Sequence, residues 1–124
     1  MCWKHSVIIA STLALLFPSF ALLADPAEVV SAQLREHNGT WNVSVTVRHG
    51  DTGWDHYADA WRVLDGEGRV LGERILHHPH VQEQPFTRSL SGVEIPQGTT
   101  TVFIQARDNQ SGWSPQTLQV DLGR

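Results

Sequence analysis

The chain has 124 residues, and its nine lysines and arginines against thirteen acidic residues give a formal net charge of −4 at pH 7. A chain of this length can bury one hydrophobic core, so we expect one domain and not two. Because no basic run is present that could neutralise phosphates, we expect no nucleic-acid partner.

The N-terminal segment, residues 1–24, has the features of a secretory signal peptide. Basic residues precede an apolar run at positions 7–17, and small residues follow at Ala21 and Ala24. The run is shorter than the roughly 20 residues of a transmembrane helix, and no later stretch is as apolar. We expect cleavage after Ala24, or alternatively after Ala21, and a periplasmic or secreted domain at residues 25–124.

This mature domain would lack sulfur-containing side chains. Cys2 and Met1, the one cysteine and the one methionine of the chain, both lie in the signal segment, so disulfides are excluded. A soft Cu⁺ site is disfavoured for the same reason, because such sites use cysteine and methionine ligands. Without Lys4 the domain has eight arginines against thirteen acidic residues, a net charge of 8 − 13 = −5.

Alternating apolar and polar residues predict short strands along the whole domain. A first strand is expected at residues 28–34, before a tight turn at residues 37–39. In the second, at residues 41–48, every second residue is apolar, which is the period of a strand with one buried face. The apolar faces expected for these two strands are Val30, Ala32 and Leu34, and then Trp41, Val43, Val45 and Val47.

Further strands are expected beyond the polar loop that follows. A hairpin is predicted from residues 57–64 and 69–76, then a strand at residues 86–93 and two final strands. Turn-forming residues separate each of these segments from the next. The residues expected on the core side are Tyr57, Asp59, Trp61 and Val63, then Val102, Ile104 and Ala106, and finally Leu118, Val120 and Leu122.

Seven short strands, with turns about every 8 to 12 residues, predict an all-β fold of two packed sheets. The strand order, Trp61 on the third strand and the ending TTVFIQARDNQSGWSPQTLQVDL resemble an immunoglobulin or fibronectin type III domain over nearly the whole mature chain. The resemblance implies a seven-strand immunoglobulin-like sandwich. Two features depart from it, because Val102 stands where the fibronectin pattern usually has tyrosine, and the immunoglobulin cysteines are missing.

Two loop sequences carry a second resemblance. HGDTGWDHYADAWRV and HPHVQEQPFTRSL are similar to segments of small exported proteins of proteobacteria. This resemblance implies export and no particular activity.

Five of the seven histidines lie in loops that the predicted topology brings to one end of the sandwich. Successive strands run in opposite directions, so the loops at residues 49–56, 77–85 and 108–115 emerge together. We call this end, formed by these three loops, the histidine pole. Immunoglobulin-like domains commonly bind ligands with such loops, which makes the histidine pole the predicted functional site.

Imidazole is a good ligand for Zn²⁺ and Cu²⁺, so the histidine pole predicts a divalent transition-metal site. In an extended segment, residues two apart point the same way, which lets His78 and His80 present a pair of nitrogens. His49 or His56 from the neighbouring loop would complete the set. The predicted metal ligands are therefore His49, His56, His78 and His80, with His77, Asp51 and Glu83 as additional candidates.

The alternatives to a metal site remain open on sequence grounds. Histidines are acceptable in loops, and no spacing matches a specific motif such as HExxH. Trp54 and Trp113 are predicted either to contact a ligand or to pack over the end of the core. The sequence thus favours an exported, non-enzymatic binding module, with a protein-interaction domain without metal as the alternative.

A hydrolase is the third and weakest hypothesis, and no catalytic residue is assigned. Asp51-Thr52-Gly53 matches the triplet of aspartic proteases. Those enzymes need two facing copies that share a proton, and this chain has one. No nucleophile elbow accompanies the histidines either.

Overall fold

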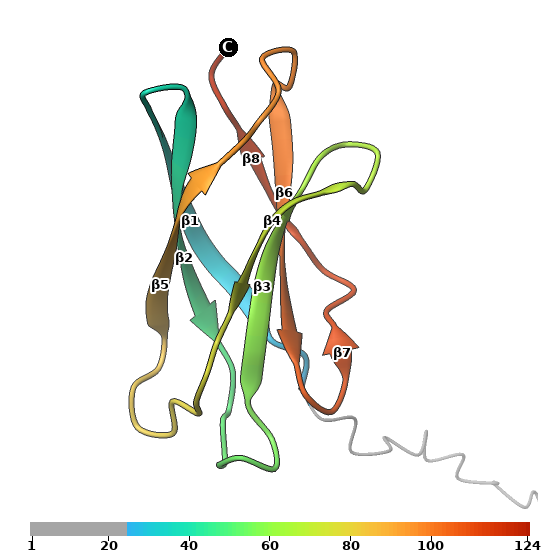
Figure 1. Cartoon of the computed structure of the whole chain (residues 1–124). Coiled ribbons are helices and arrows are strands. Elements are labelled where there is room, and N and C mark those ends of the chain that lie inside the picture. The colour runs from blue at the N-terminus through green and yellow to red at the C-terminus, as the bar shows by residue number, and fades with distance from the viewer. Residues whose placement is uncertain (1–24) are drawn as a thin grey trace, which may run out of the picture.

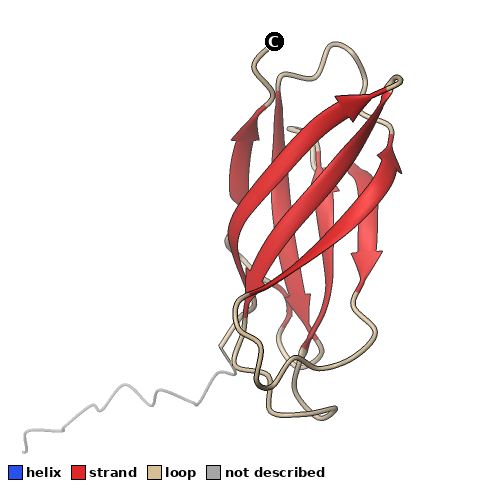
Figure 2. Ribbon diagram, turned by 90° about the vertical axis from the view of Figure 1, so that its left-hand side faces the viewer, coloured by secondary structure: helices blue, strands red, loops and turns tan. Residues whose placement is uncertain are grey.

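The computed structural model describes residues 25–124, and this part of the chain consists of strands, turns and loops (Figure 2). The predicted signal peptide lies outside the described residues. Within residues 25–124 no helix has the length and apolar character needed to cross a membrane.

Eight strands form two antiparallel sheets (Figure 1). The three-stranded sheet has the order β1-β2-β5, and the five-stranded sheet has the order β4-β3-β6-β7. The strand β8 also pairs with β6, along its first half, whereas β7 pairs with the end of β6. The strands of the first sheet are β1 (Glu28–His37), β2 (Thr40–Arg48) and β5 (Phe86–Val93). Those of the second are β3 (Ala58–Leu64), β4 (Val70–Ile75), β6 (Thr101–Asp108), β7 (Gly112–Trp113) and β8 (Leu118–Asp121).

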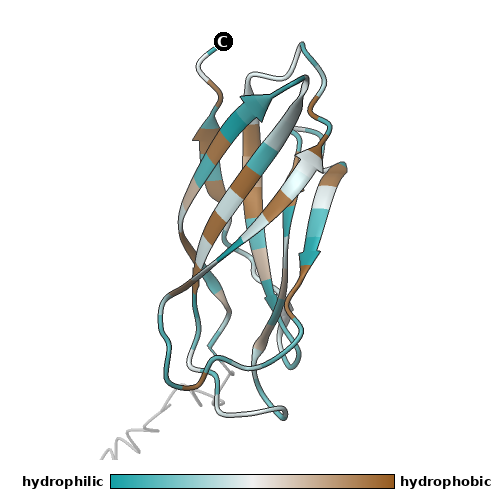
Figure 3. Cartoon of the chain, turned by 60° about the vertical axis from the view of Figure 1, so that its left-hand side comes forward, coloured by the Kyte–Doolittle hydropathy of each residue, from teal (hydrophilic) through white to brown (hydrophobic). Residues whose placement is uncertain are grey.

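The two sheets share one hydrophobic core, an arrangement consistent with a β-sandwich. Bands of apolar and polar residues alternate along the strands, as the period of two predicts (Figure 3). Trp61 is fully buried between the sheets, and Leu118 and Val120 are partly buried and pack against the core. The predicted core residues of β2, β3 and β6 that are buried are Trp41, Val43, Val45, Val47, Trp61, Val63, Val102, Ile104 and Ala106.

The predicted alternation is wrong only at the start of β1 and of β3, where the pairing registers contain irregularities; Ala32, Leu34, Trp61 and Val63 face the core as predicted. In β1 the register shifts between Val29 and Ser31, so Val29 packs against the core and Val30 is exposed. In β3 it shifts between Ala58 and Ala60, which buries both alanines. Such a bulge turns the following side chains to the opposite face.

Two further strand predictions need correction. The bulge in β3 places Asp59 and Tyr57 off the core side, although the sequence predicted them on the same face as Trp61. Residues 112 and 113 were predicted in a loop but form the short strand β7, which pairs with the end of β6. Trp113 is therefore half-buried on a sheet and not an exposed loop residue.

The three loops of the histidine pole lie together at the lower end of the molecule in Figure 1. Hydrogen bonds between the loops hold them together: for example, the backbone N–H of His80 donates to Asp51 Oδ2 at 2.8 Å, and Asn109 Nδ2 donates to the carbonyl of Trp54 at 3.0 Å. Side chains from the three loops are thereby close enough to bind one ligand together.

Candidate metal centre

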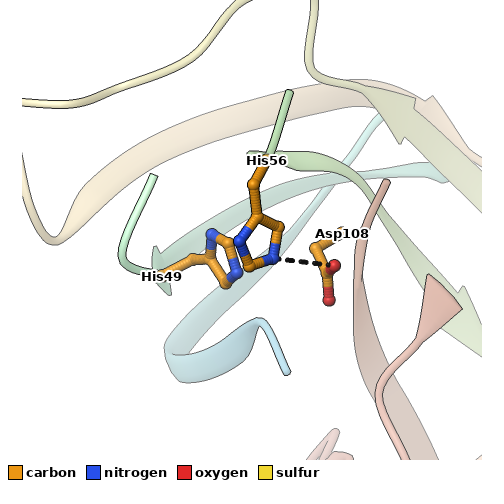
Figure 4. Close-up of side chains that lie close together, drawn as sticks. All are labelled: His49, His56 and Asp108. Carbon is orange, nitrogen blue, oxygen red and sulfur yellow. Dashed lines mark hydrogen bonds and ion pairs between the residues drawn. The ribbon is translucent and has the colours of Figure 1, made fainter. Parts of the chain in front are cut away.

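Two histidines and one aspartate form a compact cluster inside the histidine pole (Figure 4). His49 follows β2 directly, His56 precedes β3, and Asp108 is the last residue of β6. β3 and β6 are neighbours, and β2 ends beside them, so the ends of three strands place the three side chains. One nitrogen of each histidine and one oxygen of Asp108 all lie within 4.8 Å of one another.

His49 is buried and held by a carboxylate. Its Nδ1 donates to Asp51 Oδ1 at 2.6 Å, and both side chains are almost completely inaccessible to solvent. The same carboxylate accepts the backbone N–H groups of Ala58 and His80. Because this carboxylate accepts hydrogen bonds at both oxygens, we assign the proton to Nδ1 of His49, and the neutral ring then has its lone pair on Nε2. This is the usual arrangement behind a metal-binding imidazole.

The Asp108 carboxylate is fully buried but only half satisfied. Its Oδ1 accepts hydrogen bonds from His56 Nε2 at 3.2 Å and from the backbone N–H groups of Gln110 and Ser111 at 3.0 and 2.7 Å. Its Oδ2 is also buried and has no hydrogen-bond partner. A buried carboxylate oxygen without a donor is costly, so this atom calls for an explanation.

The charge state of Asp108 follows from its surroundings. Burial raises the pKa of Asp108, but the N–H groups of Ser111 and Gln110, and the neighbouring His49 and His56, outweigh that effect and bring it below its usual value. Asp108 is therefore an anion at neutral pH. It is a ready ligand for a cation.

The two imidazoles of the cluster differ in exposure. The rings of His49 and His56 meet edge to face, with centroids 4.5 Å apart and planes 82° apart. His49 is buried, whereas His56 is only partly buried. Solvent, or an ion carried by it, reaches the cluster on the His56 side.

His80 is a structural neighbour of the cluster. Its ring stacks on Phe86 with centroids 3.9 Å apart, and its Nε2 accepts a hydrogen bond from Arg88 Nη2 at 2.7 Å. Its Nδ1 is buried without a partner. Burial, and then the charges of Arg88 and His78, lower the pKa of His80, although Asp51 and Glu83 act in the opposite direction.

The other predicted ligands lie apart from the three-residue cluster. His78 is exposed, with its ring centroid 5.3 Å from that of His80, and His77 is exposed beside a different cavity. Glu83 forms an ion pair with Arg88 at 3.6 Å. Of the four predicted principal ligands, the structure brings together His49 and His56. Whether any of the four binds a metal stays a prediction.

Asp108 was not predicted as a ligand, although it lies in the loops of the histidine pole. A sequence signal was present, since an aspartate followed by Asn-Gln-Ser at a strand end favours a turn closed by the carboxylate. Asp51, predicted as an oxygen ligand or as the partner of a ligand, accepts a hydrogen bond from the His49 ring and orients it.

The two tryptophans predicted to contact a ligand have different surroundings. Trp54 is 66% exposed, with its ring edge-to-face to that of Tyr57 at 5.6 Å. Trp113 is half-buried, and the guanidinium of Arg62 lies 3.8 Å from its ring centroid. Trp54 is thus the accessible aromatic residue of this pair.

Comparison with known proteins gives one informative likeness. No family model matches the chain, and no solved structure matches it. A protein of Halomicrobium mukohataei, named "Putative lipoprotein", is 42% identical to it over 96 residues, which are 77% of this chain and 47% of that protein. The chain therefore spans about half the length of the curated relative it matches.

Proposed function

We propose that this protein is an exported, non-enzymatic binding module whose histidine pole holds a divalent transition metal, Zn²⁺ or Cu²⁺. The ligands would be His49, His56 and Asp108. The observation that carries the proposal is the buried Oδ2 of Asp108, which has no hydrogen-bond partner although its carboxylate belongs to the cluster with the two imidazoles. A bound cation would satisfy it.

The donor set suits the proposed metals. Two imidazoles and one carboxylate are common ligands of Zn²⁺ and Cu²⁺, and three protein ligands leave room for water or for a group from a partner. The Asp51 carboxylate behind His49 adds a second negative charge close to the cluster. Two carboxylates balance the charge of a divalent ion.

The positions of the imidazole protons also support the site. His49 is fixed with its lone pair on Nε2, so it needs no rearrangement to become a ligand. His56 points its Nε2 at Asp108, and the neutral ring would carry its proton on Nδ1 when Nε2 binds the ion. A metal ion and a proton compete for the same imidazole nitrogens, so binding should weaken in acid.

Export and the immunoglobulin-like fold are parts of the same proposal. The name of the Halomicrobium relative is compatible with an exported module in this chain, periplasmic or secreted. The grouping of β1, β2 and β5 in one sheet, and of β3, β6 and β8 in the other, resembles the A-B-E and C-F-G grouping of immunoglobulin-like domains.

A metal-free protein-interaction module is the second candidate. It is favoured by one observation, the exposed Trp54 at the tip of the loop that also carries His56. An aromatic side chain displayed in this way is typical of an interface anchor. A protease gains no support, because the Asp51 carboxylate is engaged by hydrogen bonds from His49, Ala58 and His80.

The decisive experiment is a Zn²⁺ and Cu²⁺ titration by calorimetry after removal of metal with a chelator. Asp108→Asn keeps an oxygen to accept from Gln110 and Ser111 but replaces the anionic oxygen, so it should fold and lose most of the binding. Asp55→Asn, an exposed aspartate of the same loop as His56, is the matched control and should bind as the wild type does.

Each outcome of this titration decides between the hypotheses. Binding of one ion per chain that depends on Asp108 supports the proposal. Equal binding by Asp108→Asn and the wild type would move the site elsewhere. No binding by the wild type would leave the protein-interaction module in front.

A further inference from the structure

A second candidate site lies outside the metal cluster, on the solvent side of the five-stranded sheet. It is an open cavity of about 340 Å³ between β4, β3, β6 and β7. The outward side chains of these strands line it, together with residues just before β3 and just after β4. The polar and aromatic residues among them are Tyr57, Asp59, Glu73, His77, Arg107 and Trp113.

The bulge in β3 places a hydrogen-bond acceptor, the carboxylate of Asp59, in this cavity. Because the register shifts between Ala58 and Ala60, Asp59 leaves the core side and pairs with Arg107 on β6. Arg107 donates to Asp59 Oδ2, while Asp59 Oδ1 is buried without a hydrogen-bond partner. Bulges often re-aim a side chain toward a ligand. Asp59 itself lines the cavity, so its carboxylate is the acceptor there that still lacks a donor.

The charges of the cavity favour a neutral ligand. Asp59 and Arg107 compensate each other, and among the described residues Glu73 forms no ion pair. Arg62, the cross-strand partner of Glu73, adds a second positive charge beside the lining residues, with its guanidinium over the ring of Trp113. The two arginines and the two carboxylates balance, so the cavity has no net charge to attract an ion.

The chemical groups favour a polyhydroxylated ligand. Asp59 and Glu73 offer acceptors and Arg107 offers donors, and a hydroxyl group can use both kinds. Tyr57, and the part of the Trp113 ring that Arg62 leaves uncovered, add aromatic surface for an apolar C–H face. The geometry points to a binding site for one neutral pyranose unit of a saccharide in this cavity, independent of the metal.

The test is an NMR titration of ¹⁵N-labelled protein with the methyl glycosides of glucose, galactose, mannose and N-acetylglucosamine. A chelator is present throughout, so the outcome does not depend on the metal site. Choline and acetate serve as cationic and anionic probes. We expect at least one glycoside to shift the indole N–H of Trp113 and the amides around Asp59 and Arg107, with millimolar affinity, as suits a shallow open site.

Three variants localise the binding. Asp59→Asn should weaken it about tenfold or more, the loss expected for a hydrogen bond to a charged group. Asp121→Asn changes an exposed aspartate of β8 and should leave the affinity unchanged. Trp54→Ala removes the exposed tryptophan outside the cavity and should also leave it unchanged.

The saccharide assignment is overturned if choline or acetate shifts these resonances and the glycosides do not, or if none of the probes shifts them. It is equally overturned if glycosides bind but the affinity depends on Trp54 and not on Asp59. Glycoside binding that Asp59→Asn weakens, and that both control variants preserve, supports it.

Discussion

Metal binding at the histidine pole should stabilise the fold by an amount that can be calculated. An ion that binds only the folded state adds RT ln(1 + [L]/Kd), which is about 2.7 kcal/mol at a hundredfold excess over Kd. For a domain of about 100 residues, 1 kcal/mol raises the melting temperature by roughly 4 to 8 °C. Zn²⁺ should therefore raise the melting temperature of the wild type by roughly 10 to 20 °C at pH 7.5.

The same stabilisation should almost disappear at pH 5. Imidazoles must be deprotonated to bind a metal, and an ordinary imidazole takes up a proton near pH 6.5. The pKa of Asp108 is lowered, so its carboxylate stays ionised at both pH values and does not cause the loss. The assay is differential scanning fluorimetry with and without Zn²⁺ at the two pH values.

Two histidine variants separate the cluster from the rest of the histidine pole. His56→Ala removes a partly buried ligand and should abolish most of the shift, because Asp108 Oδ1 keeps its two backbone donors and the fold survives. His78→Ala removes an exposed ring outside the cluster and should leave the shift unchanged. A full shift in His56→Ala, or its loss in His78→Ala, would refute the assignment of ligands.

Three predictions concern the fold. Trp61→Ala should lower the free energy of unfolding by about 3 to 5 kcal/mol in urea denaturation, and a loss under 1 kcal/mol would contradict its place in the core. Burial, and then Arg88, lower the pKa of His80 in the folded state. Below about pH 6.5 the unfolded state therefore binds a proton at this ring more readily than the folded state does. Metal-free protein should therefore lose stability from pH 7.5 to pH 5, and His80→Gln should lose less over the same range; an equal loss would contradict this origin. Gly112 has φ +79°, so Gly112→Ala should cost about 1 kcal/mol or more, whereas Gly98→Ala, without positive φ, should be nearly neutral in the same urea assay.

The sheets were predictable where the alternation of residues alone decides which face is buried. Trp41, Val43, Val45 and Val47 alternate without interruption, and all four are buried in β2. A period of two is a property of the strand itself, so it can be recognised in a single segment. The topology predicted from it correctly brought three separate loops to one end of the molecule.

The bulges were not predictable because they depend on the partner strand. Nothing local to Asp59 marks it as the residue that leaves the core side; its place is set by how β3 pairs with β6. Val30 in β1 is a parallel case, since its exposure follows from the pairing with β2. A register shift of one residue puts the side chains before it and after it out of step with a single period of two, so only one of the two groups keeps its predicted face.

The sequence predicted which loops carry the histidines to one end of the molecule, but it did not predict the directions of the histidine rings. The spacing of His78 and His80 predicted a pair of nitrogens pointing the same way, but His80 turns inward to stack on Phe86, and His78 stays exposed. Side-chain direction in a loop is set by contacts across the fold, such as the Arg88 hydrogen bond to His80, and these have no periodic signature.

The distribution of unsatisfied atoms connects the two proposed sites. Among the described residues, the buried carboxylate oxygens without a partner are those of Asp108 and Asp59, one in the histidine cluster and one in the cavity beside it. Selection for folding alone would favour a neutral or paired side chain at each place, because an unpaired buried acceptor destabilises a domain that has no disulfide to offset the loss. Both oxygens lack what a ligand supplies, a cation in one case and a hydrogen-bond donor in the other. Their neighbouring positions on β6 and β3 fit the proposal that this end of the molecule binds ligands.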